Sequence, residues 1–375
     1  MAVLGIDASR ATTSQRTGTE AYAYFLIKSL IPLAEARGHQ LRLYFNQLPA
    51  DGLFPQSDHV EIVHIPLARL WTHLRLAWEL QRRPPDVFFT PAHVIPRTYY
   101  GRSVATIHDL GYHYFPEAHP QNQLRYLKWS TQHNAKRSQV IIADSLATKA
   151  DLIARDGVSA HKIEVVYPGI DPTLQRIDDE EQITAVLERY HIKQPYLLYI
   201  GTIQPRKNLE RLIDAYLQSK VPCQLVLAGK VGWLADPIVN KIANIQKHND
   251  QSAISNLILT DYIPDEDKAP LISGATALLY PSLHEGFGFP ILEGQQCGVP
   301  VLTSTTSSCG EIAGDTAVLV DPQDTHTMAE AIKQLVVDDH LRQSLIEKGL
   351  ANVQKYTWEE TAVNVLNILE AVAQN

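Results

Sequence analysis

Two glutamates in a glycine-rich segment are the residues best suited to chemistry. Glu285 and Glu293 stand eight positions apart in His284-Glu285-Gly286-Phe287-Gly288-Phe289-Pro290-Ile291-Leu292-Glu293. The glycines permit close backbone approach, and both carboxylates can accept hydrogen bonds from vicinal hydroxyls of a sugar or ribose. Pro290 suits the first turn of a helix, whose unpaired amides add donors. The alternative is a solvated turn beside a carboxylate that only complements the helix dipole.

The surrounding residues resemble a known family and favour the ligand site. Tyr280 to Pro300, Y-P-S-L-H-E-G-F-G-F-P-I-L-E-G-Q-Q-C-G-V-P, is similar to the donor-binding signature of family 4 retaining glycosyltransferases, the group 1 glycosyl transferases. Weaker matches cover nearly the whole chain. The resemblance implies a mannosyltransferase-like protein of the GT-B fold, in which Glu293 holds the ribose. It also implies that the donor sugar is positioned by Glu285, Gly286, Phe287 and Gly288.

A second loop supplies positive charge. Gly201-Thr202-Ile203-Gln204-Pro205-Arg206-Lys207-Asn208 follows an apolar run and ends in two cations at a helix start. Arg206 offers a planar fork for diphosphate oxygens, and Lys207 a movable point charge. Such pairs also occur in ordinary solvated loops, but this one matches the diphosphate-binding loop of the resembled family. We therefore expect a cationic clamp for a nucleoside diphosphate sugar, with no metal and no other cofactor.

The first half of the chain offers two further site residues. His108 ends the run Ser103 to Ile107, and the resemblance implies that it contacts a sugar hydroxyl or orders the acceptor. Asp109 is more simply a turn residue. Gly18 precedes the first long helix, where many family members carry two adjacent glycines. A backbone contact to the diphosphate there is therefore about as plausible as a simple helix N-cap by Thr17 or Thr19.

The nucleobase site is expected from the family pattern alone. Tyr262 and Ile263, in Asp261-Tyr262-Ile263-Pro264-Asp265-Glu266, hold the corresponding position. Base contacts in this region often use backbone groups, so the side chains do not distinguish guanine from uracil. The following helix is weakened by Pro270 and Gly274.

Short apolar runs alternate with helical stretches, which is typical of parallel sheets built from βαβ units. The first predicted strands are Val3 to Ile6, Leu41 to Phe45, Glu61 to Ile65, Val87 to Thr90, Val104 to Ile107 and Val140 to Ala143. A second series comprises Tyr196 to Ile200, Gln224 to Ala228, Leu257 to Thr260, Ala277 to Tyr280, Val299 to Thr303 and Ala317 to Val320. We expect two doubly wound α/β domains.

The domain limits follow from turn and helix signals. We place the first, acceptor-side domain at residues 1–172 and the second, donor-binding domain at 173–356, with a hinge near Gly169. The last helix, from about 357 to 375, resembles the one that packs back on the first domain in this family. Thr357 as its N-cap and Glu360 three residues later mark its start.

Composition limits the function classes. A chain of 375 residues with 45% hydrophobic residues can bury the cores of two domains. Met1 to Asp7 is interpreted as a strand rather than a signal peptide, and no apolar run is long enough to span a bilayer, so we expect a cytoplasmic location. Cys223, Cys297 and Cys309 lack metal-ligand spacing and are predicted to be buried thiols.

Charge is divided unevenly along the chain. Residues 1–172 contain 18 basic against 15 acidic residues, and residues 173–375 contain 15 basic against 26 acidic. The first half would therefore meet an anionic acceptor or membrane more readily.

In the segment from Leu67 to Arg83, the predicted helix face consists of Leu67, Leu70, Trp71, Leu74 and Trp78. We favour packing of this face on its own sheet; peripheral contact with anionic lipid is the alternative.

These features together predict a retaining glycosyltransferase that moves a hexosyl group, with mannosyl favoured, from a GDP- or UDP-linked donor to an acceptor hydroxyl. The acceptor would be a carbohydrate or a lipid-linked glycan of surface polysaccharide or glycolipid synthesis, and nucleic acid is not expected as a partner. Two alternatives stay open: a GT-B epimerase acting on a nucleotide sugar, and a catalytically silent nucleotide-sugar-binding subunit. A Rossmann dehydrogenase is disfavoured because no G-x-G-x-x-G follows either first strand.

Overall fold

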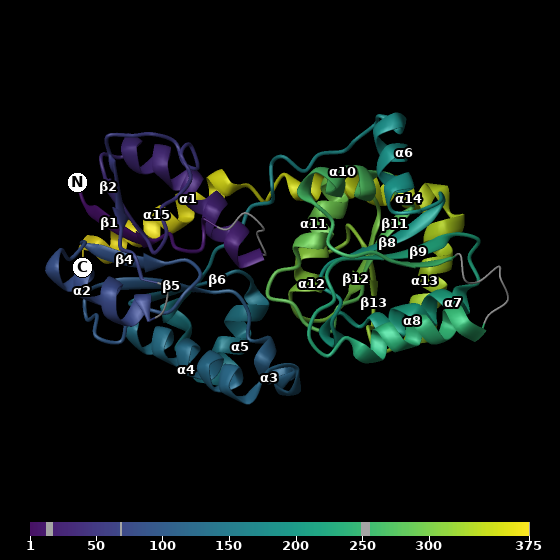
Figure 1. Ribbon diagram of the computed structural model, residues 1–375, viewed down its shortest axis with the longest axis horizontal. Coiled ribbons are helices and arrows are strands. Elements are labelled where there is room, and N and C mark those ends of the chain that lie inside the picture. The colour runs from purple at the N-terminus through teal and green to yellow at the C-terminus, as the bar shows by residue number, and fades with distance from the viewer. Residues whose placement is uncertain (13–17, 68–69, 249–255, 375) are drawn as a thin grey trace. The chain divides into compact units, whose positions relative to one another are not determined.

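The protein forms two compact units, each a parallel β-sheet covered by helices (Figure 1). The structure is a computed structural model that describes residues 1–12, 18–67, 70–248 and 256–374. Unit 1 consists of Met1–His113, Pro120–Gly169 and Tyr356–Asn375, and unit 2 of Tyr114–His119 and Ile170–Lys355. The expected fold class, with two doubly wound parallel sheets, is confirmed.

Seven parallel strands form the sheet of unit 1, in the order β3-β2-β1-β4-β5-β6-β7. They are β1 (Val3–Asp7), β2 (Gln40–Phe45), β3 (Val60–His64), β4 (Val87–Thr90), β5 (Ser103–Ile107), β6 (Val140–Ala143) and β7 (Ile163–Val165). Every residue of β4 and β5 is buried, because helices cover both faces of such a sheet. The short edge strand β7 was not predicted. The strand order reverses between β1 and β4. In sheets of this kind, ligands bind at the carboxyl ends of the two strands on either side of the reversal.

The helices of unit 1 include one from each end of the chain. They are α1 (Gly18–Ala36), α2 (Ala77–Arg82), α3 (Gly111–Tyr114), α4 (Gln121–Arg137), α5 (Leu146–Asp156) and α15 (Trp358–Gln374). The first and last of these pack together, and Figure 1 shows yellow α15 beside purple α1. Trp358 stacks on Phe25 with ring centroids 5.6 Å apart and meets Tyr22 edge-on at 5.7 Å. The carboxyl-terminal helix therefore completes the core of unit 1.

The predicted packing face between Leu67 and Arg83 is wrong for three of its five residues, while Leu67 and Trp71 pack on the core as predicted. Leu70, Leu74 and Trp78 are exposed, whereas the buried apolar residues are Trp71, Leu76, Ala77 and Leu80. The helical phase differs because Thr72–Leu76 is a π-helical turn and Leu70 has a left-handed backbone with φ of 59°. Residues 68 and 69 lie outside the described residues. The segment thus turns three large apolar side chains away from its own sheet.

Six parallel strands form the sheet of unit 2, in the order β10-β9-β8-β11-β12-β13. They are β8 (Tyr196–Ile200), β9 (Gln224–Ala228), β10 (Leu257–Leu259), β11 (Ala277–Tyr280), β12 (Val301–Ser304) and β13 (Val318–Val320). The helices are α6 (Glu180–Arg189), α7 (Leu209–Ser219), α8 (Asp236–His248), α10 (Asp265–Ser273), α11 (Phe289–Gln296), α12 (Ser307–Ala313), α13 (Thr325–Val337) and α14 (Asp339–Val353). The strand order reverses between β8 and β11, which brings the loops after these two strands to one place on the sheet edge. None of the helices in the described ranges has the length and apolar character needed to cross a membrane.

Candidate functional site

The two loops predicted to bind a ligand leave neighbouring strands at the carboxyl edge of unit 2. The loop after β8 leads through a 3-10 turn, Pro205–Lys207, into α7. The loop after β11 leads to Gly288 and then α11. Asn208 ties the loops together, because its Nδ2 donates to the carbonyl oxygens of Pro281, at 3.1 Å, and Pro322, at 2.6 Å. The Asn208 side chain therefore fixes the two loops relative to each other.

Glu285 binds both cations of the first loop. Nη1 of Arg206 donates to Glu285 Oε2 at 2.9 Å and to the carbonyl oxygen of His284 at 2.7 Å. Nζ of Lys207 donates to Glu285 Oε1 at 2.5 Å. Arg206 and Lys207, two of the residues predicted to act on the donor, thus bind the carboxylate of a third, Glu285. This contact between positions almost eighty residues apart was not foreseen.

The carboxylate of Glu285 is buried and receives two further hydrogen bonds. Its Oε1 accepts from the hydroxyls of Tyr280, at 2.8 Å, and Ser282, at 2.5 Å. Burial raises the pKa of Glu285, but the charges of Arg206 and Lys207 and the hydrogen bonds from Lys207 and Ser282 outweigh it and lower the pKa to about 2. Glu285 is therefore a permanent anion near neutral pH, which suits a counter-ion better than a proton donor.

Lys207 is buried beside four other ionisable side chains, those of Arg206, Glu285, Tyr280 and Cys309. Burial lowers its pKa below the ordinary lysine value; Glu285 opposes this shift and the Arg206 guanidinium adds to it. The thiol of Cys309 also lies near enough to interact with its charge. Within the described residues, the charges of Arg206, Lys207 and Glu285 leave one net positive charge at the start of α7, which favours an anion there.

The glycine loop before α11 has the geometry that its sequence indicated. Gly288 adopts φ of 105°, which disfavours any other residue, and caps the helix with Pro290 in its first turn. Phe287 is buried and meets Phe289 edge-on at 4.9 Å. Gly286 is buried as well, next to Glu285. Contacts of these residues with a donor sugar stay a prediction.

Glu293 binds a different lysine from Glu285. Nζ of Lys268, in α10, donates to Glu293 Oε1 at 2.5 Å. Burial lowers the pKa of Lys268, but the carboxylates of Glu293, Asp265 and Asp171 together outweigh it, so the net shift is upward. The two glutamates thus bind different cations: Glu285 binds Arg206 and Lys207, and Glu293 binds Lys268. Lys268 was missed because nothing in its sequence neighbourhood marks it as a partner of α11.

The two residues predicted near the nucleobase, Tyr262 and Ile263, differ in burial. Ile263 is buried in the core of unit 2, so its side chain is not available to a base. Tyr262 is half-buried, and Nζ of Lys230 lies 4.6 Å from its ring centre. Lys230 follows β9 directly after Gly229, where an added Cβ would lie 2.1 Å from the carbonyl oxygen of Gly201. Only glycine permits this contact between the loops after β8 and β9.

His108 lies in unit 1 and has a partner at each ring nitrogen. Nδ1 is 2.6 Å from Asp144 Oδ2, and Nε2 is 2.8 Å from the carbonyl oxygen of Pro91. Because a carbonyl only accepts, Nε2 carries a hydrogen. Burial lowers the pKa of His108, but the Asp144 carboxylate, the Pro91 carbonyl and the Asp109 charge together outweigh it, so the ring holds its proton more tightly than usual. A contact between His108 and a sugar stays a prediction.

The remaining predicted positions have simpler surroundings. Asp109 Oδ1 accepts from the backbone N–H of Gly111 at 2.9 Å, which is the turn role predicted for it. Gly18 is the first residue of α1. The residues before it, 13–17, lie outside the described residues, and the predicted diphosphate contact stays a prediction. In the part of the chain that the structure describes, no three His, Cys, Asp or Glu side chains are grouped as metal ligands.

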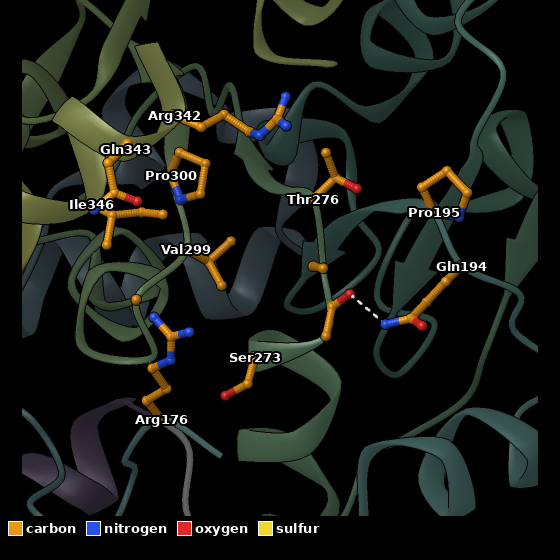
Figure 2. Close-up of a pocket in the computed structure, with 13 residues that line it drawn as sticks. Arg176, Gln194, Pro195, Ser273, Thr276, Val299, Pro300, Arg342, Gln343 and Ile346 are labelled. Carbon is orange, nitrogen blue, oxygen red and sulfur yellow. Dashed lines mark hydrogen bonds between the residues drawn. The ribbon is translucent and has the colours of Figure 1, made fainter. Parts of the chain in front are cut away.

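A hollow of about 390 Å³ lies at the opposite edge of the unit 2 sheet (Figure 2). Its lining includes Pro195, Thr276 and Pro300, which immediately precede β8, β11 and β12. Arg176 and Arg342 also line it, but each is paired with a nearby carboxylate, Asp178 and Asp339 respectively. We therefore assign the candidate site to the carboxyl edge, around Arg206 and Lys207.

Comparison with known proteins identifies the family of the chain. The family model for glycosyl transferases group 1 matches residues 183–351, and that for glycosyltransferase family 4 matches residues 17–174. The O-antigen chain mannosyltransferase B of Escherichia coli is 31% identical over 304 residues, which cover 80% of this chain and 78% of that protein.

Solved structures share the fold at low sequence identity. Sucrose-phosphate synthase from Thermosynechococcus elongatus superposes with a TM-score of 0.74 at 18% identity, covering 99% of both chains. Anabaena Alr3699/HepE, in complex with UDP-glucose, has a TM-score of 0.73 at 16% identity, covering 98% of this chain and 99% of that one. The expected GT-B fold is thereby confirmed.

Proposed function

The chain belongs to the group 1 glycosyl transferases, and from this premise we propose that it is a retaining mannosyltransferase. Its donor is a nucleoside diphosphate sugar, and its acceptor is a hydroxyl of a carbohydrate or lipid-linked glycan in surface polysaccharide or glycolipid synthesis. The choice of mannose is supported by the similar mannosyltransferase of Escherichia coli. The choice of a nucleoside diphosphate is supported by the UDP-glucose complex of the similar fold.

The observation that carries the proposal is the joint binding of Arg206 and Lys207 by Glu285. Negative charge develops on the departing diphosphate during transfer, and two cations held in advance stabilise it without reorganising. Glu285 serves this step by keeping both cations in place. Glu293, held by Lys268, accepts hydrogen bonds from the ribose hydroxyls.

The transfer balances without a carboxylate nucleophile. The bond between the anomeric carbon and the diphosphate oxygen breaks while the acceptor oxygen bonds the same carbon from the same face. The acceptor proton passes to the departing phosphate oxygen. His108, which donates from Nε2, orders a hydroxyl of the sugar or acceptor once a ligand replaces the carbonyl of Pro91 as its partner.

The test is to incubate the protein with GDP-mannose or UDP-glucose and a mannose-terminated oligosaccharide, and to determine the product by NMR. An α-linked glycoside from the α-linked donor supports retention, and a β-linked product contradicts it. A new nucleotide sugar without glycoside would favour the epimerase alternative. Donor binding without turnover over a range of acceptors would favour the silent subunit.

A peripheral membrane contact is part of the proposal because one surface of unit 1 suits it. Leu70, Leu74 and Trp78 are exposed beside the exposed Arg75 and Arg82. The Arg82 guanidinium lies 5.2 Å from the Trp78 ring centre. Apolar side chains flanked by arginines bind at the interface of an anionic bilayer. A location in the cytoplasm, at the face of such a bilayer, is consistent with an acceptor that carries a lipid.

A further inference from the structure

Tyr280 is a buried tyrosine whose hydroxyl lies inside the group of charges around Glu285. It is the last residue of β11, and its side chain is 2% exposed. Its ring stacks on that of Tyr199, from β8, with centroids 6.0 Å apart and planes 12° apart. The backbone carbonyl of Tyr280 accepts from the hydroxyl of Thr303, in β12, at 2.8 Å. Neighbouring strands on both sides thus fix the position of the phenol.

The hydrogen bonds of the phenol have only one possible direction. Nζ of Lys207 lies 2.6 Å from the Tyr280 oxygen, and Glu285 Oε1 lies 2.8 Å from it. An ammonium group only donates and a carboxylate only accepts. The phenol therefore accepts from Lys207 and donates to Glu285. With the direct contact between Lys207 Nζ and Glu285 Oε1 at 2.5 Å, the three side chains form a closed triangle.

This triangle determines where the lysine points. A lysine ammonium is a compact charge on a flexible stem, so its direction depends on its acceptors. Two of its three N–H groups donate to Tyr280 and Glu285. The direction of the third follows from these two. Without the phenol, the ammonium would keep a single acceptor and could rotate about the contact with Glu285.

We propose that Tyr280 is a positioning residue that aims the ammonium group of Lys207 at a diphosphate oxygen of the donor. This inference rests on the proposed function. It adds a residue that bears no charge and touches no substrate, but determines how well one cation meets the leaving group. A purely structural tyrosine would contribute to folding and leave donor binding unchanged.

Tyr280→Phe is the test variant and Tyr196→Phe is the matched control. Tyr196 is equally buried, in β8, and its hydroxyl donates to the Leu271 carbonyl oxygen at 2.6 Å, away from the cations. Calorimetric titration with GDP and with UDP measures binding, and thermal unfolding reports whether each variant folds. We expect Tyr280→Phe to weaken binding of the preferred nucleotide about tenfold, the effect of a hydrogen bond to a charged group. Tyr196→Phe should bind as the wild type does.

The pH dependence of transfer separates positioning from packing. The groups that face Lys207 are Arg206, Glu285, Tyr280 and Cys309. Removing the phenol oxygen takes away an acceptor that stabilises the ammonium form, so the pKa of Lys207 falls. The alkaline limb of kcat/KM should therefore move to lower pH in Tyr280→Phe and stay in place in Tyr196→Phe.

Each outcome bears on a distinct claim. Wild-type binding and transfer, with weaker binding and a shifted limb in Tyr280→Phe alone, support the inference. Equal binding and equal pH profiles in all three proteins overturn the inference and leave the proposed function standing. A wild-type protein that binds neither GDP nor UDP overturns both. Should Tyr280→Phe unfold, Lys207→Arg serves instead. The wider guanidinium group of arginine cannot make both contacts of the triangle, those to Tyr280 and Glu285. A change in nucleotide binding therefore supports the inference, and unchanged binding overturns it.

Discussion

Lys268 donates to Glu293 across 2.5 Å, from helix α10 to helix α11, and thereby neutralises the second glutamate of the motif. The first glutamate is neutralised by Arg206 and Lys207. On the proposed function, a nucleotide sugar at this edge of unit 2 meets one ion pair and one group of three charges with a net positive charge, instead of two bare carboxylates. The predictions below test what each pair contributes.

Lys268→Met should raise the KM for the donor about tenfold and change kcat less. The loss of a charged hydrogen-bond partner leaves Glu293 without its fixed direction, which weakens ground-state and transition-state binding alike. Steady-state kinetics with varied donor measure the effect. Lys241→Met is the control, because Lys241 pairs with Asp214 on the surface of the same unit at 2.6 Å. Equal kinetics in both variants would remove Lys268 from the site.

Lys207→Ala should lose donor binding and turnover together, with kcat/KM falling on the order of 100-fold. The reason is that the ammonium stabilises charge that develops on the leaving diphosphate. Nucleotide titration and single-turnover transfer report the two effects separately. Lys220→Ala, at an exposed lysine just after α7, is the control. Transfer that survives in Lys207→Ala at the wild-type rate would contradict the site.

Glu285→Gln should flatten the acid dependence of stability. The folded pKa of Glu285 is about 2 and its ordinary value is 4.5. Because the folded pKa is depressed, the carboxylate contributes stability fully above pH 4.5, and loses it as pH falls towards 2. The contribution is about 3 kcal/mol at neutral pH. Urea unfolding of unit 2 between pH 2 and 7 should show this slope in the wild type and in Glu188→Gln, an exposed control, and lack it in Glu285→Gln. A retained slope in Glu285→Gln would refute the assignment.

His108→Ala should leave nucleotide binding nearly intact and lower transfer on the order of 100-fold. His108 belongs to unit 1, whereas Arg206 and Lys207 belong to unit 2. Loss of an orienting group affects the chemical step more than donor affinity. Calorimetry and transfer rates give the two numbers. His161→Ala removes an exposed histidine of the same unit and should change neither. An equal loss of nucleotide binding and transfer would speak for a collapse of unit 1.

Trp78→Glu should reduce binding to vesicles that contain phosphatidylglycerol about tenfold, because it replaces an apolar side chain by an anion. Co-sedimentation with and without the anionic lipid measures the effect. Trp233→Glu alters an equally exposed tryptophan of unit 2 and is expected to bind vesicles like the wild type. Binding that is absent in the wild type, or unaffected by Trp78→Glu, rules out this membrane surface.

Much of the strand pattern was predictable because the strands are apolar runs bounded by turns. Val87–Thr90, Tyr196–Ile200 and Ala277–Tyr280 have the predicted bounds. β12 starts at Val301 rather than Val299, since Pro300 has no N–H to donate to a ladder. The buried face of the helix between Leu67 and Arg83 could not be predicted correctly. A π-helical turn changes which side chains share a face, and the pattern of apolar residues does not reveal such a turn.

The motifs predicted which residues share the site, but not how they bind one another. Arg206, Lys207 and Glu285 were expected to bind one donor, and their direct contacts were not expected. Tyr280 and Lys268 were missed as partners. Their contacts to the predicted residues join positions brought together by the sheet and by neighbouring helices, 73 and 25 residues apart. Local sequence does not contain this information.

The last helix of the chain has a consequence for the order of events during synthesis. Trp358, Leu366 and Leu369 fill the same core as Tyr22 and Leu26, close to the start of the chain. When the ribosome has released residues 170–355, unit 2 can already be complete, while unit 1 still exposes the apolar face of α1. Unit 1 therefore finishes folding after unit 2, and a nascent chain must keep this face from aggregating until α15 has been made.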